Sequence, residues 1–164
     1  MKTLLTQLAT YNLWANGLIA ACIQKLPANL HTQTVHGSFP SLQATLLHLW
    51  DAESVWWQRM KLQEQVIWPS TGFSDDLDAV VKSLLNQSRQ WQEWVQQAQD
   101  HMLEHEFIYQ TSKKEKFKQP VFQVLLHLFN HGTYHRGQIV TMLRQLGVTA
   151  IPASDFIIWC RSRS

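Results

Sequence analysis

The chain has 164 residues, of which 45% are hydrophobic and 16% charged, and its formal net charge is +2. This length fits one domain, expected to span residues 1–164, and the composition excludes extended disorder, which needs low hydrophobicity with high net charge. Because the charge is mild and the Lys and Arg residues are scattered, we expect no nucleic-acid partner.

Helical periodicity predicts a first helix over residues 3–25, in which apolar residues recur every three or four positions and Pro27 lies just beyond the end. A second helix is expected from about Pro40 through Met60, with Ser38 as its N-terminal cap.

A third helix is expected to follow Ser74, because a hydroxyl before Asp75 and Asp76 is typical of a helix N-terminus. We predict that it continues to about residue 104. The next segment, 106–118, changes character: aromatic residues flank a polar, lysine-containing stretch, which favours a short hairpin between helices.

The fourth long helix is predicted to open at Pro120 and to end at Gly147, and a last short helix is expected from Asp155 to Cys160. Long helices with short connections pack most readily as an antiparallel bundle. We therefore predict an all-α four-helix bundle with a short hairpin-like insertion before the fourth helix and a short C-terminal helix.

The cysteines and the N-terminus indicate the compartment. Cys22 and Cys160 lie near opposite ends of the chain, without the spacing of a zinc knuckle or a small disulfide framework. The N-terminus lacks an apolar signal-peptide region, and no apolar run of about eighteen residues follows. We expect a cytoplasmic protein without a membrane partner.

Three of the eight histidines recur at four-residue intervals in the fourth predicted helix, at His127, His131 and His135. Imidazoles at i and i+4 lie on one helix face and can converge on one metal ion, although such a pair is often an accident of surface or core. On a helical wheel His131 and His135 point inward, whereas His127 lies at the polar edge of the helix. There His127 is either a residue beside the ion or an alternate ligand. Buried imidazoles need a partner for each ring nitrogen, and a metal would supply one.

A third ligand must come from another helix, and His48 is the best candidate. His31 and His36 fall in a polar connection, and His101 and His105 close a polar helix. Small neighbours of His48 would leave room for an ion, but it lies off the apolar stripe of its helix. Either that helix is buried over a wide arc, or His48 lies at the rim of the bundle.

Glu53 does fall on that apolar stripe, where a carboxylate is costly to bury. It is a reserve metal ligand or a base beside the ion, and the alternative is that it pairs with an arginine.

Three segments together resemble the DinB superfamily: Tyr11-Asn12-Leu13-Trp14-Ala15-Asn16, His48 with the following Ala52-Glu53 and Trp57, and Asn130-His131-Gly132-Thr133-Tyr134-His135-Arg136-Gly137-Gln138. The last motif is the specific one, and the resemblance covers nearly the whole chain. It implies a commonly dimeric four-helix bundle in which His48, His131 and His135 bind a divalent metal ion. It also favours His48 over Glu53 as a ligand.

Three imidazoles without a cysteine ligand would leave a coordination position open, which is typical of catalytic metal sites. Zinc and nickel both suit neutral imidazole, and the ion would lower the pKa of a bound water or thiol. Relatives in this superfamily act as S-transferases for low-molecular-weight thiols such as bacillithiol, or as mycothiol-dependent isomerases. The resemblance therefore implies a metal-bound thiolate that attacks a small electrophile.

Two further features are compatible with that chemistry. Arg136 could pair with a carboxylate of a thiol cofactor, or form an ordinary salt bridge at the surface or an interface. Several tryptophans could wall an apolar pocket or simply belong to the core: Trp50, Trp56, Trp57, Trp91 and Trp94.

Two other functions stay open. A metal-dependent hydrolase would need a general base near the ion, for which Glu53 is the inward acid. A non-enzymatic protein would use the ion only to stabilise a dimeric bundle. For a transferase or a hydrolase, the expected partner is a small-molecule substrate. The expectation of a homodimer rests on the resemblance to the superfamily.

Overall fold

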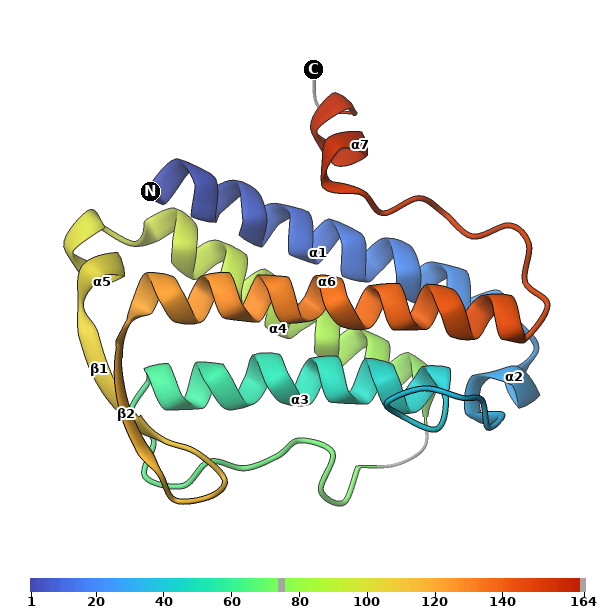
Figure 1. Cartoon of the computed structure of the whole chain (residues 1–164), viewed down its shortest axis with the longest axis horizontal. Helices are drawn as coiled ribbons and strands as arrows, with labels where there is room; N and C mark the ends of the chain where they lie inside the picture. Colours follow the sequence, from blue (N-terminus) through green and yellow to red (C-terminus); the bar gives the residue numbers. More distant parts are fainter. Residues whose placement is uncertain (74–75, 163–164) are drawn as a thin grey trace.

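Four long helices form the body of the computed structural model, which describes residues 1–73 and 76–162 (Figure 1). These helices are α1 (Lys2–Gln24), α3 (Leu42–Met60), α4 (Leu77–Gln97) and α6 (Val121–Gln145). Each of α1 and α3 packs against both α4 and α6. The predicted helical bundle is confirmed.

Five short elements complete the described chain. They are the helices α2 (Ala28–Thr32), α5 (Asp100–Glu104) and α7 (Phe156–Arg161), and the strands β1 (Glu106–Gln110) and β2 (Lys116–Pro120). The strands pair antiparallel, with Tyr109 opposite Phe117, and this hairpin crosses one end of the bundle (Figure 1). The predicted hairpin and C-terminal helix are therefore present. None of the described helices has the length and apolarity that crossing a membrane requires.

The helices are not antiparallel throughout. In Figure 1, α3 and α4 run in the same direction, and α1 and α6 run together in the opposite one. The reason is the connection between α3 and α4, which returns along the length of the bundle instead of making a short turn. Long crossover connections of this kind are an established variant of the four-helix bundle.

Some predicted boundaries were wrong. The cap of α3 is Ser41, whose hydroxyl accepts a hydrogen bond from the Ala44 amide at 3.2 Å, whereas Ser38 lies outside the helix. The third predicted helix is broken at Ala98, where an extended backbone (ψ 138°) ends α4 and separates it from α5. This bend carries the chain back so that Leu103 is buried.

Other boundaries agree with the sequence. The α6 helix follows Pro120 and ends before Gly147, which adopts a φ of +81° that favours glycine. Asp76 caps α4 by accepting a hydrogen bond from the Asp78 amide at 3.0 Å. The predicted contributions of Ser74 and Asp75 lie outside the described residues. The short α2 was not predicted.

A polar layer separates the two larger of the three apolar clusters that the described residues form. One, away from the hairpin, contains buried residues such as Ile19, Leu46, Leu84 and Ile139. The other, at the hairpin end, contains Trp91, Phe107, Leu125 and Phe129 among others. Between them every long helix contributes a buried polar side chain, listed from α1 to α6 as Asn12, Asn16, Glu53, Ser88 and Arg136.

Candidate metal centre

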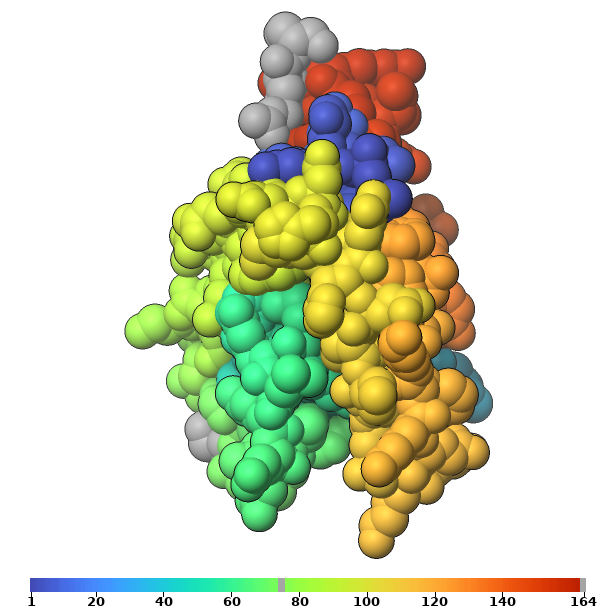
Figure 2. All heavy atoms as spheres, turned by 90° about the vertical axis from the view of Figure 1, so that its left-hand side faces the viewer, coloured from blue at the N-terminus to red at the C-terminus, as the bar shows by residue number. Residues whose placement is uncertain are grey.

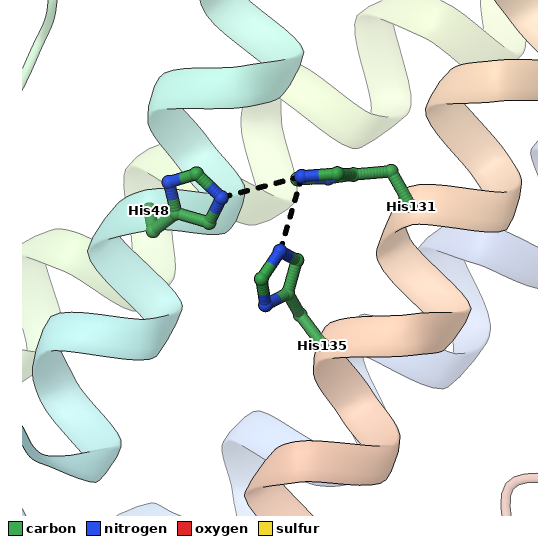
Figure 3. A group of neighbouring side chains, drawn as sticks. All are labelled: His48, His131 and His135. Atoms are coloured by element: carbon green, nitrogen blue, oxygen red, sulfur yellow. Dashed lines mark hydrogen bonds between the residues drawn. The ribbon is translucent and has the colours of Figure 1, made fainter. Parts of the chain in front are cut away.

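Three histidines from two neighbouring antiparallel helices point toward one another (Figure 3). His48 comes from α3, and His131 and His135 come from successive turns of α6. The Nε2 atom of His131 lies 3.3 Å from Nε2 of His48 and 3.0 Å from Nε2 of His135. One ring nitrogen from each residue lies within 4.8 Å of the other two. The three rings therefore present nitrogen atoms to one shared point.

The protonation of His135 is set by a neighbour on its own helix. Its Nδ1 atom lies 2.8 Å from the Gln138 side-chain oxygen, which can only accept, so Nδ1 carries the proton. The Gln138 amide nitrogen in turn donates to the Ser38 hydroxyl at 2.6 Å. In a neutral ring this leaves the Nε2 lone pair of His135 directed at the cluster.

No placement of protons turns both contacts of the His131 ring, to His48 and to His135, into hydrogen bonds. If Nε2 of His131 carries a proton, it can donate to His135 but cannot accept from His48. If it carries none, two lone pairs face each other at 3.0 Å. A cation at the shared point would accept a lone pair from each ring, and this makes the cluster fit a metal ion.

Burial keeps these imidazoles in the form that binds metals. Burial first, and the neighbouring imidazoles second, together lower the pKa of His48 and His131 to about 4. Burial also lowers the pKa of His135, against the hydrogen bond to Gln138. At neutral pH all three rings are therefore uncharged.

The separation of the nitrogens suits a small divalent ion. A tetrahedral site with metal–nitrogen bonds of about 2.05 Å places its ligand atoms about 3.3 Å apart. The two close Nε2 pairs, at 3.0 and 3.3 Å, lie near that value. Among the described residues, no further His, Cys, Asp or Glu joins the group. Three nitrogen donors would leave a coordination position for a small molecule.

The cluster is covered on one side and accessible on the other. Phe39, in the loop before α3, stacks on the His48 ring at a centroid distance of 4.2 Å and lies 5.6 Å from His135. His135 is buried, whereas His48 and His131 are half-buried. His48 thus lies at the rim of the bundle, which was one of the two alternatives from the sequence.

His127 lies outside the group of three. It is exposed, one turn before His131, and the two ring centroids are 5.8 Å apart. Its ring makes an edge contact with Trp56, at 5.6 Å. This agrees with its expected place at the edge of the helix, beside the site.

Glu53 lies in the polar layer rather than in the histidine cluster. Its carboxylate accepts hydrogen bonds from the Asn12 and Asn16 amides, at 2.8 and 3.0 Å, and from the Ser88 hydroxyl, at 2.8 Å. Burial raises the pKa of Glu53 to about 7, although these hydrogen bonds and the nearby Arg136 act in the opposite direction. No proton-accepting role beside the ion follows from this arrangement.

Arg136 belongs to the same layer, with only 2% of its surface exposed. Its Nη1 donates to the Asn12 and Asn16 side-chain oxygens, at 2.8 and 2.7 Å, and its Nη2 donates to Thr133. The two asparagines thus bridge Arg136 and Glu53, which form no direct ion pair. A surface salt bridge, one of the sequence interpretations, is excluded by this burial.

The tryptophans divide between core and site. Trp91 is fully buried, with its ring 5.0 Å from Trp57, and its indole N–H donates to the Glu53 carbonyl. Trp50 packs against Phe73. The core interpretation holds for Trp91, whereas the half-buried Trp56 contacts His127 beside the metal centre.

Sequence reasoning assigned no role to several residues that shape these clusters. Asn12 and Asn16 stand four apart in an apolar helix, and this spacing was the available signal. Gln138 follows His135 by three positions, which places its amide next to a candidate ligand. Phe39 lies in a loop, and no sequence pattern places it against His48.

Two comparisons with known proteins bear on this site. A model of the DinB family matches residues 1–158. The chain is also similar to "Protein DinB" of Bacillus subtilis (strain 168), with 28% identity over 162 aligned residues, covering 89% of this chain and 88% of that protein. The matched region includes all three clustered histidines.

Proposed function

The chain belongs to the DinB family, and from this premise we propose that it is a metal-dependent S-transferase that activates a low-molecular-weight thiol against small electrophiles. His48, His131 and His135 would hold the ion. The observation that supports this most is the convergence of three Nε2 atoms, together with the Gln138 contact that directs the His135 lone pair inward.

The donor set favours zinc or nickel, since neutral imidazole suits both ions. When bound, the ion would lower the pKa of a thiol at its open position, so that a thiolate exists near neutral pH.

The chain's own residues would orient and shield this site. Gln138 holds the His135 ring in its ligand orientation, and the stacked Phe39 excludes water from one side of His48. The half-buried His48 and His131 leave the other side accessible to a small molecule.

A hydrolase is less well supported. Its general base was to be Glu53, but both oxygens of that carboxylate accept hydrogen bonds inside the polar layer. A purely structural ion in a dimeric bundle would require no accessible position beside the histidines. The homodimer, the small-molecule partner and the cytoplasmic location stay predictions.

The first test is the metal content of protein purified without a nickel column. We expect about one zinc or nickel ion per wild-type chain, and a loss of that ion in His131→Ala, because His131 contacts both other ligands. His127→Ala, one turn away and outside the group, is the matched control and should keep the ion. Negligible metal in wild type and His131→Ala alike would reject the site.

The second test concerns the thiol. Titration of the cobalt-substituted protein with low-molecular-weight thiols should change its visible spectrum, because a thiolate would enter the coordination shell. With 1-chloro-2,4-dinitrobenzene as electrophile, the sulfur would bond to the ring carbon as chloride leaves and the thiol proton passes to solvent. An unchanged spectrum across the thiols, with metal bound, would reject the thiol-dependent function.

A further inference from the structure

One face of α3 leads from the metal centre toward the hairpin. His48, Ala52, Trp56 and Arg59 stand at i, i+4, i+8 and i+11, so their side chains lie along one side of the helix. Ala52, between the histidine and the tryptophan, has a small side chain and is half-buried. This face therefore connects the three histidines with the end of α3.

A row of aromatic rings lies along this face, and each ring contacts the next. The His131 ring lies 5.8 Å from His127, His127 lies 5.6 Å from Trp56, and Trp56 lies 4.8 Å from Tyr109 in β1. The row thus begins at a candidate metal ligand and ends at the hairpin. It offers ring faces and edges to the apolar part of a ligand.

Arg59 lies at the far end of this row. The Cζ atom of its guanidinium is 4.9 Å from the Trp56 ring centroid and 5.8 Å from that of Tyr109. Among the described residues its guanidinium makes no hydrogen bond or ion pair, and its Nε is buried without a partner. Burial accordingly lowers the pKa of Arg59.

An unpartnered guanidinium held against rings is suited to an oxyanion. Buried polar groups usually have a partner, and leaving one unpaired costs about 1–3 kcal/mol. The planar fork of arginine matches the two oxygens of a carboxylate. The aromatic contacts orient this fork but leave its N–H donors free.

A cavity of about 350 Å³ lies beside Arg59. Its walls come from the segment after α3, including Trp68, and from the hairpin, including Ile108 and Tyr109. Figure 2 shows the molecule hollowed between these two segments, at the end that faces the viewer. Glu64 also lines the cavity, but it forms no ion pair with Arg59.

The surrounding charge favours an anion. Four lysines stand on the hairpin and its turn, against the two acids Glu106 and Glu115, and one of these acids is paired with Lys118. Such an excess of positive charge raises the local concentration of anions. The lysines are Lys113, Lys114, Lys116 and Lys118.

We propose that Arg59 and this cavity bind the carboxylate of the small molecule whose reactive group lies at the three histidines. This inference rests on the proposed function for the identity of that group, a thiol. It makes Arg59 a specificity-determining residue, and Trp56 and Tyr109 the surface along which the ligand lies.

The geometry also sets the size of the ligand. Arg59 lies eleven positions after His48, which corresponds to about 16 Å along the helix axis. A thiol of tripeptide size is about 10–11 Å long when extended. With a metal–sulfur bond of about 2.3 Å at one end and a hydrogen bond of about 2.8 Å to the guanidinium at the other, it reaches about 16 Å, whereas cysteine is too short.

The test uses metal-free full-length protein and S-methylglutathione, whose blocked sulfur cannot act as a thiolate. Because Trp56 and Trp68 flank Arg59, binding should change the tryptophan fluorescence. We expect Arg59→Gln to weaken binding at least tenfold and Arg59→Lys to weaken it less. The exposed Arg89, whose guanidinium donates to the Asn86 side chain, gives the matched control Arg89→Gln, with unchanged binding.

Two outcomes would overturn the inference. One is equal affinity of wild type and Arg59→Gln, with circular dichroism showing both to be folded. The other is equal binding of S-methylglutathione and its diethyl ester, which lacks both carboxylates. A failure of the proposed function looks different, because glutathione would then leave the cobalt spectrum unchanged while the carboxylate still binds at Arg59.

Discussion

The protein holds two polar clusters that share the helices α3 and α6, and they differ in how many of their hydrogen-bonding groups have a partner within the chain. In the polar layer, the amide donors meet the Glu53 carboxylate and the guanidinium donors of Arg136 meet the amide oxygens. In the histidine cluster, the central ring cannot satisfy both of its neighbours. Apart from Nε of Arg136, which is buried without a partner, the first cluster is satisfied within the chain, and the second becomes complete only with a cation.

This difference separates a structural role from a chemical one. The polar layer joins all four long helices, and two apolar half-cores pack on either side of it. The histidines join only α3 and α6 and lie at the rim. Variants in the layer should therefore change folding stability, and variants in the histidine cluster should change metal binding.

The largest effect should follow the removal of Glu53. Glu53→Ala leaves the Asn12 and Asn16 amides and the Arg136 charge buried without their acceptor, at a cost of about 3–5 kcal/mol in unfolding free energy. Urea denaturation measures this loss, and Glu93→Ala, at an exposed position on α4, is the control. A loss below 1 kcal/mol would mean that the layer is not the structural centre of the bundle.

The histidine cluster should show the opposite pattern. His131→Ala in metal-free protein should change stability by less than about 1 kcal/mol, because its ring is half-buried and poorly satisfied. Zinc at a hundred times its dissociation constant should stabilise wild type by about 2.7 kcal/mol and leave the variant unchanged. Thermal unfolding with and without zinc measures both. Equal stabilisation of the two proteins would place the ion elsewhere.

A smaller effect is expected at the contact between α6 and α1. A Cβ at Gly132 would lie 2.8 Å from the Asn12 side-chain oxygen and 2.9 Å from Nη1 of Arg136, closer than such atoms approach. Gly132→Ala should destabilise the protein by about 1–3 kcal/mol. Gly137→Ala, on the same helix with open space around it, should stabilise it by about 0.5–1 kcal/mol. Similar melting temperatures for both variants would contradict the tight contact.

The pH dependence of stability should distinguish the clusters most finely. Because the pKa of Glu53 is raised from 4.5 to about 7, the native state holds a proton in this range that the unfolded chain has lost. Stability from Glu53 is thus present below pH 4.5 and lost as pH rises through 7. The lowered pKa values of His48 and His131 act oppositely, so stability from them is lost as pH falls from 6.5 to about 4.

Variants separate the two contributions in metal-free protein. From pH 5 to 8, urea midpoints of wild type should fall relative to those of Glu53→Gln, which does not titrate. They should rise relative to those of His48→Ala. If the difference in urea midpoint between wild type and Glu53→Gln stays constant with pH, Glu53 has the same pKa in the folded and the unfolded state.

Local patterns predicted the elements better than their arrangement. Proline, glycine and apolar periodicity located the four long helices, because each signal acts within a few residues of the chain. The parallel pair α3 and α4 was not predicted, since it depends on where the connection after Met60 returns. The break at Ala98 was also missed, because burial of Leu103 beyond it is a tertiary effect.

By itself, the sequence determined that α6 presents His131 and His135 on one face, because their four-residue spacing is a property of any helix. Only the tertiary structure decided that His48 meets them, that Arg136 turns inward to two asparagines of α1, and that Arg59 is left without a partner. The reason is that each of these contacts, or its absence, depends on which helix faces which, and that arrangement is set by packing over the whole bundle rather than within one segment.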